Sequence, residues 1–464
     1  METIEQDKES RIRYPYKSPT PDQISIVATG IRIDGDNSGI DGVSAQVFEQ
    51  LSQCNFNAAH LSGNIDDAEG IKRDAMVTSL GNALKWNINI IAGCHFFSLG
   101  HAIDATTDLQ RAKDFFDFFV SLSLYENRRG ENVLNNANAI YGWLLRDEPT
   151  YSQLEDTADG YNLKTIYDYI QFHDYKRRPV QINLVGGECK FTEGHTYEAY
   201  LNLFQQNFHS TLWSYDLYPI TQESCLINNA CNLTDNCKIK VDRKGFYNDF
   251  NIFHEKSKAT GGVFWAYVQS MEFINGSSLH PAAIESYIRF EAFSALAFGA
   301  QGIVYWAYKQ RPNTSEVYPS ALVDRNGNKM PAWYFAKQVN HEIMQYSKVF
   351  VNSELIGWAH TGDSYGGPSI GSGSFGAILS IKTSGTGALV TQLKTNDHNY
   401  MVIVSHDVEE YQTVDLTFVP TVIYELTPLT SYGEHGKETQ LKTRTIKREL
   451  IPGGYLIYEF KGGA

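Results

Sequence analysis

Short apolar runs rich in β-branched and aromatic residues alternate with amphipathic stretches along residues 22–350. The short runs are typical of buried strands, and the stretches between them repeat apolar residues at the spacing of helices. Such alternation is typical of parallel α/β architecture. The eight expected strands are Ile24–Gly30, Phe56–Gly63, Ile88–Cys94, Ile140–Glu148, Val180–Val185, Thr211–Tyr218, Val263–Gln269 and Ile303–Tyr308.

Helices are expected in several of the intervening stretches. The clearest periodic segments are Leu109–Leu124, Tyr161–His173, Glu285–Phe298 and Ala332–Phe350. Eight strand–helix pairs in about 330 residues match a closed (β/α)₈ barrel of the α/β class. A doubly wound open sheet is the main competitor. Its dinucleotide-binding version is disfavoured because no Gly-x-Gly-x-x-Gly motif follows the first strand.

The pattern changes after Phe350. Gly and Ser crowd the segment Gly362–Gly376, and short alternating runs separated by turn residues follow it. This pattern predicts an antiparallel β-sandwich. We therefore expect an N-terminal extension at 1–21, a barrel at 22–350 and a small sandwich domain at 351–464.

Composition narrows the class of ligand. A formal net charge of −14 argues against nucleic acid and anionic membranes as partners, because both require a basic surface. Aromatic residues make up 13% of the chain, and their flat faces suit pyranose rings, although large cores also use them. No apolar run is long enough for a transmembrane helix. The polar first residues contain no signal-peptide core, so a secreted, periplasmic or surface-exposed location is favoured only if such a peptide was removed.

Candidate chemistry gathers where the expected strands end, which is where barrels of this kind place their active sites. A glycosidic bond is cleaved by two carboxyl groups, and sugar hydroxyls and ring faces need amide and aromatic partners. The two histidines at these ends fit no His-Glu-x-x-His pattern, so we expect neither a metal nor a cofactor. The candidates along the rim are His60, His95, Asp147, Glu148, Asn183, Asp216, Tyr218, Gln269, Glu272, Trp306 and Tyr308.

The strongest single signal is the segment GWLLRDEPT, residues 142–150. A buried strand that ends abruptly in two acids and a proline places charge at a barrel mouth. The structural alternative is that Asp147 or Glu148 caps the next helix or pairs with Arg146. Because alternate strand residues face opposite sides, an inward Glu148 predicts that Asp147 points toward the helices.

These motifs resemble the glycoside hydrolases of the large barrel clan that includes β-galactosidase-like enzymes. The triplet Asp147-Glu148-Pro149 is similar to the one that ends the fourth strand in that clan, where its Glu is the acid/base. The segments Ser214–Ile220 and Arg289–Tyr308 resemble its sixth-strand element and its seventh-helix and eighth-strand element. The C-terminal run IPGGYLIYEF resembles its accessory β-domains. The resemblance covers nearly the whole chain and implies a glycosidase with Glu148 as acid/base.

One position departs from that clan, which places its nucleophilic Glu at the end of strand seven. Here that strand ends at Gln269, and an amide cannot act as a carboxylate nucleophile. Glu272 could reach back from the following loop, Asp216 could serve as the second carboxylate, or the protein could bind sugar without cleaving it. We favour Asp216, because a strand end holds its side chain rigidly.

The sequence therefore predicts a glycoside hydrolase that cleaves oligo- or polysaccharide with two carboxyl groups. A non-catalytic carbohydrate-binding protein on the same barrel is the alternative, and a lyase or isomerase is a weaker third. Asp147, Asn183, Gln269, His60 and His95 are candidate sugar ligands. Trp306, Tyr218 and Tyr308 are candidate ring-binding residues, whereas mid-strand Trp143 and Trp213 are expected in the core.

Overall fold

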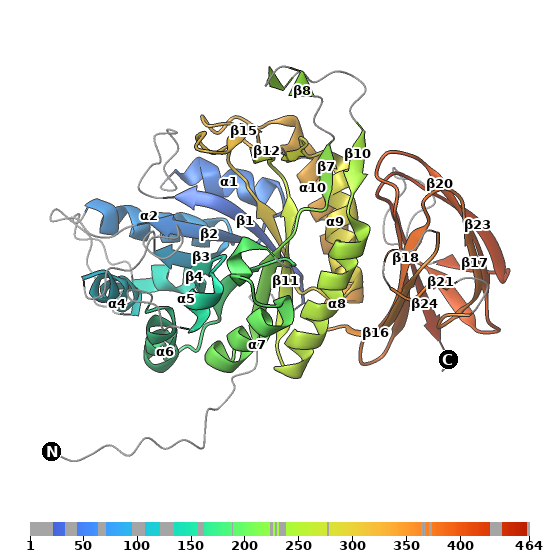
Figure 1. The fold of residues 1–464 in the computed structure, drawn as a ribbon, viewed down its shortest axis with the longest axis horizontal. Helices are drawn as coiled ribbons and strands as arrows, with labels where there is room; N and C mark the ends of the chain where they lie inside the picture. Colours follow the sequence, from blue (N-terminus) through green and yellow to red (C-terminus); the bar gives the residue numbers. More distant parts are fainter. Residues whose placement is uncertain are drawn as a thin grey trace, which may run out of the picture.

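The computed structural model describes residues 22–32, 44–63, 71–94, 107–120, 134–155, 162–187, 189–222, 226–227, 230–231, 238–275, 278–362, 365, 367–370, 374–426 and 439–461. Within these ranges, parallel strands close into a barrel wrapped by helices, and antiparallel sheets follow toward the C-terminus (Figure 1). The predicted fold class is confirmed.

The barrel has eight described strands, and each pairs in parallel with its neighbours until the last one pairs with the first. This closed ring excludes the doubly wound open sheet. The strands are β1 (Ser25–Arg32), β2 (Ala58–Gly63), β3 (Asn89–Cys94), β4 (Ile140–Asp147), β5 (Val180–Val185), β6 (Leu212–Asp216), β11 (Val263–Gln269) and β14 (Gly302–Trp306).

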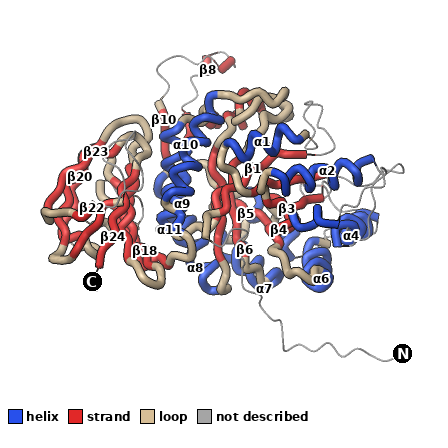
Figure 2. The backbone as a smooth tube through the Cα atoms, turned by 180° about the vertical axis from the view of Figure 1, so that it is seen from behind, coloured by secondary structure: helices blue, strands red, loops and turns tan. Residues whose placement is uncertain are grey.

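Helices cover the outside of the barrel, as the view from behind shows (Figure 2). None of the helices in the described ranges is long and apolar enough to cross a membrane. The main helices are α1 (Ala45–Gln53), α2 (Ile71–Lys85), α4 (Thr107–Val120), α6 (Leu163–His173), α7 (Tyr197–Phe208), α8 (Arg243–Ala259), α9 (Glu285–Ala297) and α10 (Pro331–Gln345). Shorter turns of helix are α5 (Tyr151–Glu155), α11 (Ser347–Phe350), η2 (Leu134–Ala139) and η3 (Lys190–Thr192).

Alternate strand residues build two separate layers of core. The barrel interior is filled by a small cluster that includes Val27, Leu144, Trp265 and Val304. The residues between them point outward into a much larger core shared with the helices, which buries Trp143 and Trp213 as predicted. This alternation is the period of two that a strand imposes on its side chains.

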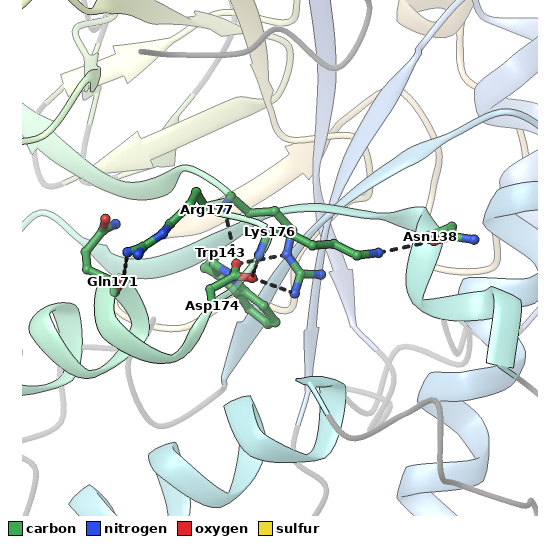
Figure 3. A network of polar contacts seen from close by, with 7 residues as sticks. Asn138, Trp143, Gln171, Asp174, Lys176 and Arg177 are labelled. Carbon is green, nitrogen blue, oxygen red and sulfur yellow. Dashed lines mark hydrogen bonds and ion pairs between the residues drawn. The ribbon is translucent and has the colours of Figure 1, made fainter. Parts of the chain in front are cut away.

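The outward face of β4 is fixed by a buried network around Asp174, which follows α6 (Figure 3). The Asp174 carboxylate accepts hydrogen bonds from Trp143 Nε1 at 2.8 Å and from Arg178 Nε and Nη2 at 2.9 and 3.1 Å. The Arg178 guanidinium also lies 4.7 Å from the centre of a Trp143 ring. Lys176 reaches Asn138 at 3.2 Å, so the segment between α6 and β5 is tied to the start of β4.

Two antiparallel sheets follow the barrel. The larger contains six described strands in the order β16-β18-β19-β24-β21-β22, and the smaller contains three in the order β17-β20-β23. Their bounds are β16 (Glu354–His360), β17 (Ile378–Thr383), β18 (Ala388–Lys394), β19 (Asn399–Ser405), β20 (Gln412–Phe418), β21 (Val422–Glu425), β22 (Thr439–Gln440), β23 (Thr445–Leu450) and β24 (Tyr455–Lys461).

The larger sheet is buried on both faces because it lies between the smaller sheet and the barrel helices. On β19, Met401 and Ile403 face a core shared with the smaller sheet, whereas Val402 and Val404 join the barrel core. On the barrel side it contacts α9, whose residues from Tyr287 to Ala297 are all buried. A helix that is covered all round loses the one-sided apolar pattern of a surface helix.

Short strands beyond the barrel form a further sheet that the sequence did not predict. Its order is β10-β7-β13-β12-β15, and a separate two-stranded ribbon joins β8 to β9. In the chain, β7 follows β6, β12 follows β11 and β15 follows β14. Figure 1 shows these three short strands near one another at the top of the view. The bounds are β7 (Ile220–Gln222), β8 (Leu226–Ile227), β9 (Ala230–Cys231), β10 (Ile239–Val241), β12 (Glu272–Asn275), β13 (Ser278–His280) and β15 (Val317–Ser320).

The network behind β4 gives a stability prediction. Asp174→Asn leaves the buried Arg178 without its counter-charge, so we expect a loss of about 3 to 5 kcal/mol in the free energy of unfolding. Asp168→Asn is the matched control, because its partner Lys164 lies on the same exposed helix face and such pairs contribute about 0 to 1 kcal/mol. Urea unfolding of both variants measures the difference. Equal losses of unfolding free energy in the two variants would contradict a stabilising role for this network.

Candidate active site

An irregularity in β4 decides which of its residues face the barrel mouth. In the pairing with β5, Leu144 lies opposite Gln181, whereas Arg146 already lies opposite Ile182. One residue, Leu145, is therefore extra on β4, which is the pattern of a β-bulge. Beyond the bulge, the alternation of inward and outward side chains is reversed.

The reversal overturns the expectation that Asp147 points toward the helices. Asp147 lies opposite Asn183 and accepts a hydrogen bond from Asn183 Nδ2 at 2.9 Å inside the barrel mouth. Arg146 instead faces outward, and its Nη2 donates to Gln153 Oε1 of α5 at 3.0 Å. A strict alternation of inward and outward side chains could not predict this, because the extra residue at the bulge reverses the alternation beyond it.

Glu148 follows the strand in a left-handed conformation, with φ of 46°. Few residues other than Gly adopt this region, and it costs about 1 kcal/mol or more. Its backbone N–H donates to the Asn183 carbonyl at 2.9 Å, which holds the turn. The turn brings the Glu148 side chain to the same mouth as Asp147 and Asp216, close enough for the carboxyl groups to affect each other's pKa.

Asn183 connects the carboxyl groups of two strands. Its amide nitrogen donates to Asp147 Oδ1 at 2.9 Å and to Asp216 Oδ1 at 3.0 Å. Both amide hydrogens are thus engaged, and the buried Asn183 Oδ1 has no hydrogen-bond partner within the described part of the chain. Asn183 therefore links two carboxyl groups, and its role as a sugar ligand stays a prediction.

The three carboxyl groups hold protons more tightly than usual. Burial, followed by the charge of Asp147, raises the pKa of Glu148 to about 7. Burial, followed by the charges of Glu148 and Asp147, raises the pKa of Asp216 well above its ordinary value. Burial also raises the pKa of Asp147, although its side chain borders the open mouth, and the amide of Asn183 opposes this rise. Like charges this close cannot all ionise, so the cluster keeps a proton near neutral pH.

Cations at the rim oppose these shifts. Arg311 lowers the pKa of Asp147, and Lys190 lowers the pKa of Glu148, whereas Glu316 raises the latter slightly. The Arg311 guanidinium lies 4.9 Å from the centre of a Trp306 ring. Sequence reasoning missed these three charged residues, because they lie on loops after β5 and β14 rather than at strand ends.

Tyr267 is a further residue that the sequence did not single out. It lies on β11 two positions before Gln269 and faces the barrel interior. Its hydroxyl oxygen accepts a hydrogen bond from Gln181 Nε2 at 3.5 Å, and the charges of Asp147 and Asp216 raise its pKa in addition to burial. The sequence could have predicted this orientation, because residues two apart on a strand face the same side and Trp265 also faces inward.

The end of strand seven offers no carboxylate. Gln269 is buried, and its amide nitrogen donates to the carbonyls of Pro281 at 2.6 Å and Met271 at 3.4 Å. Glu272 accepts a hydrogen bond from Ser320 Oγ at 3.0 Å. It lies on the opposite face of β12 from Met271 and Phe273, which pack in an apolar cluster with Tyr218 and Trp306. Gln269 and Glu272 are thus both held by groups outside the carboxyl cluster.

The remaining candidates lie at different depths. Tyr218 and Trp306 are partly buried and line the mouth above the interior cluster. His60 lies deeper, where its Nε2 contacts Gln181 Oε1 at 2.8 Å. Tyr308 lies in the outer core, and its hydroxyl donates to Gln50 Oε1 of α1 at 3.2 Å, so it does not face the mouth. His95 lies outside the described residues.

A close backbone approach places Asp216 beside β5. The Gly186 N–H donates to the Asp216 carbonyl at 3.0 Å. A Cβ at Gly186 would lie 2.8 Å from that carbonyl oxygen and 3.0 Å from Asp249 Oδ2, so only Gly fits here.

In the described ranges, no group of three or more His, Cys, Asp or Glu is arranged to hold a metal.

Comparison with known proteins bears on the fold and the class of protein. Residues 167–346 match the family model of glycoside hydrolase family 42, described as β-galactosidase. A β-galactosidase from Bacillus circulans sp. alkalophilus superposes with a TM-score of 0.57 over 95% of this chain and 99% of its own, at 9% identity. A catalytic mutant of Gan42B, a family 42 β-galactosidase from G. stearothermophilus, superposes with a TM-score of 0.56 over 95% and 99%, at 8% identity.

A search of curated protein sequences finds no match to this chain. The structural similarities, at such low identity, show a shared fold, and the family match adds the class of chemistry. Residues 167–346 span the strands from β5 to β14, which carry Asn183 and Asp216. This segment is similar to family 42 of the glycoside hydrolases, and the protein is a glycosidase on a (β/α)₈ barrel.

Proposed function

We propose that the protein hydrolyses β-galactosides, with Glu148 as the general acid and Asp216 as the second carboxyl group. The observation that carries this proposal is the carboxyl cluster at the mouth, in which Asn183 joins Asp147 to Asp216 and both acids lie near enough to affect the pKa of Glu148. Glycosidic cleavage needs one carboxyl group that is still protonated at the working pH. Glu148 meets this need, because burial and the charge of Asp147 raise its pKa to about 7.

The surroundings give each carboxyl group a different task. Asp147 is fixed by Asn183 and repels negative charge on Glu148, which keeps the Glu148 proton available for the leaving oxygen. After this proton departs, Lys190 partly offsets the new charge. Asp216, held by Asn183 on the facing strand, offers the second carboxyl group next to the sugar.

The galactoside preference is supported by the description of the matched family and by the names of the two superposed β-galactosidases. Trp306 and Tyr218 supply partly exposed ring faces at the mouth, which suit the apolar face of a pyranose. Residues 351–464 are proposed to form an accessory module, since their sheet packs on α9, away from the carboxyl cluster.

Carbohydrate binding without hydrolysis is the second candidate, and Gln269 favours it. This amide occupies the position where a strand-seven nucleophile would lie, and it is already bound to two backbone carbonyls. That candidate predicts sugar binding by calorimetry with no release of product. Release of sugar by the wild-type protein and its loss in the variant below would reject it.

The catalytic assignment predicts the effect of removing the acid. Glu148→Gln should lower kcat/KM for an aryl β-galactoside by about 10²- to 10⁴-fold, because the amide cannot supply the proton. Glu272→Gln is the matched control and should keep nearly full activity, since Glu272 contacts Ser320 on the far face of β12. Undiminished turnover by Glu148→Gln would refute the assignment.

The raised pKa also predicts a pH-dependent gain in stability. A carboxyl group with a raised pKa contributes stability at low pH that is lost as pH rises toward about 7. Glu148→Gln removes this loss, so its Tm should exceed that of the wild type by roughly 2 °C at pH 8 and by less at pH 4.5.

Glu449→Gln, on the exposed side of β23, is the control and should show no such trend. Calorimetric scans at several pH values measure the difference between each variant and the wild type. A Tm difference between Glu148→Gln and the wild type that shrinks as the pH rises would count against the raised pKa.

A further inference from the structure

Arg311 lies over the aromatic side chains of one wall of the barrel mouth. Its guanidinium carbon is 4.9 Å from the centre of a Trp306 ring and 5.5 Å from the centre of the Tyr318 ring. Trp306 is the last residue of β14, two positions after the inward-facing Val304, and it packs against the interior cluster of the barrel. These ring contacts place a cation at the mouth.

The Arg311 guanidinium has no carboxylate partner among the residues that the structure describes. Within them it makes no ion pair and donates no hydrogen bond, although Arg311 is half-buried. Glu316, on the same loop, accepts a hydrogen bond from the Tyr318 hydroxyl instead. The buried Arg289, by contrast, pairs with Glu342 at 2.9 Å. Because ring faces offset only part of the cost of removing a cation from water, Arg311 is still in need of a strong acceptor.

The loop that carries Arg311 is held by hydrogen bonds of its own. Arg325 Nη2 donates to the Arg311 carbonyl at 3.1 Å and to Asn313 Oδ1 at 3.3 Å. Gln310 Nε2 donates to the Tyr318 carbonyl at 2.9 Å. A cation on such a loop is already in position, so a ligand that binds it loses less free energy to the ordering of the site.

The order of the strands puts this loop across the mouth from the proposed acid. Going round the barrel from β14 to β4, three strands intervene on either path: β11, β6 and β5 on one, and β1, β2 and β3 on the other. Asp147 is the last residue of β4, and Glu148 follows it. A sugar between the two walls, with its glycosidic bond at Glu148, would therefore turn its far end toward Arg311.

Resting on the proposed function, we infer that the galactoside carries an anionic group, a carboxylate or a sulfate, and that Arg311 binds this group. The planar fork of a guanidinium matches two oxygens of such a group with two parallel hydrogen bonds. A neutral sugar would leave the cation with ring faces and water as its surroundings. C6 is the carbon of a galactopyranoside that can be oxidised to a carboxylate without opening the ring, and a sulfate on O6 would occupy the same end of the sugar.

The carboxyl cluster opposes an anionic sugar less than three full charges would. Burial raises the pKa of Asp147, Glu148 and Asp216, so the cluster keeps a proton near neutral pH. Lys190, exposed on the segment after β5, adds a second cation to the rim. The charged group of the sugar would also lie at the wall opposite the cluster.

The test compares three aryl β-galactosides that differ only at C6: the alcohol, the carboxylate and the 6-sulfate. With the full-length protein, we expect kcat/KM for one of the anionic substrates to exceed that for the alcohol by about 10-fold or more, and the preferred one identifies the group. Arg311→Gln should lower kcat/KM for that substrate by about 10- to 100-fold and for the alcohol by less than about 3-fold. Arg311→Lys keeps the charge without the fork and should show an intermediate preference.

Lys329→Gln is the matched control. Lys329 Nζ lies 3.8 Å from the centre of a Trp333 ring in the outer core, so this variant removes a ring-bound cation away from the interior cluster. It should leave the preference among the three substrates unchanged. A preference lost equally in Lys329→Gln and Arg311→Gln would contradict the assignment to Arg311.

Calorimetry with galactose, galacturonic acid and galactose 6-sulfate separates this inference from the proposed function. Arg311-dependent preference for an anionic sugar, without hydrolysis of any aryl substrate, would keep the inference and reject the function. Glu148-dependent hydrolysis without an anionic preference, or with equal losses on all three substrates in Arg311→Gln, would overturn the inference and keep the function. Neither hydrolysis nor preferential binding would count against both.

Discussion

Repulsion between carboxyl groups that share one amide is the interaction on which the site depends. Asn183 can donate only two hydrogens, and it gives them to Asp147 and Asp216. Burial raises the pKa of all three carboxyl groups, and repulsion between neighbouring charges raises those of Glu148 and Asp216 further. The barrel keeps the three carboxyl groups close together, because its parallel strands end at one rim and leave these side chains little freedom to separate.

The crowding relies on two local departures from regular structure. The bulge at Leu145 turns Asp147 inward, and the left-handed turn brings Glu148 beside it. Both cost free energy that the rest of the strand must offset, and the buried network of Asp174 and Arg178 behind β4 is placed to do so. Strain and buried charge at a barrel mouth are typical of sites selected for chemistry over stability.

The sequence predicted the regular parts of the molecule and missed the irregular ones. Hydrophobic periodicity located all eight strands, and the rule that barrels work at their strand ends pointed to Glu148 and Asp216. The orientation of Asp147 was missed because a bulge leaves no mark in the apolar pattern. Tyr308 was expected at the mouth, but strand β14 ends two residues earlier and leaves its ring in the outer core. The small sheet over the mouth was missed because its strands have only three or four residues each.

The most direct test of the account is the proton affinity of Glu148 itself. Carbon-13 NMR of carboxyl-labelled protein, with Glu148→Gln used to assign the signal, follows its titration. We expect a midpoint near pH 7 in the wild type and a clearly lower one in Asp147→Asn, where the neighbouring charge is gone. A midpoint near the ordinary glutamate value of about 4.3, unchanged by Asp147→Asn, would contradict the central claim.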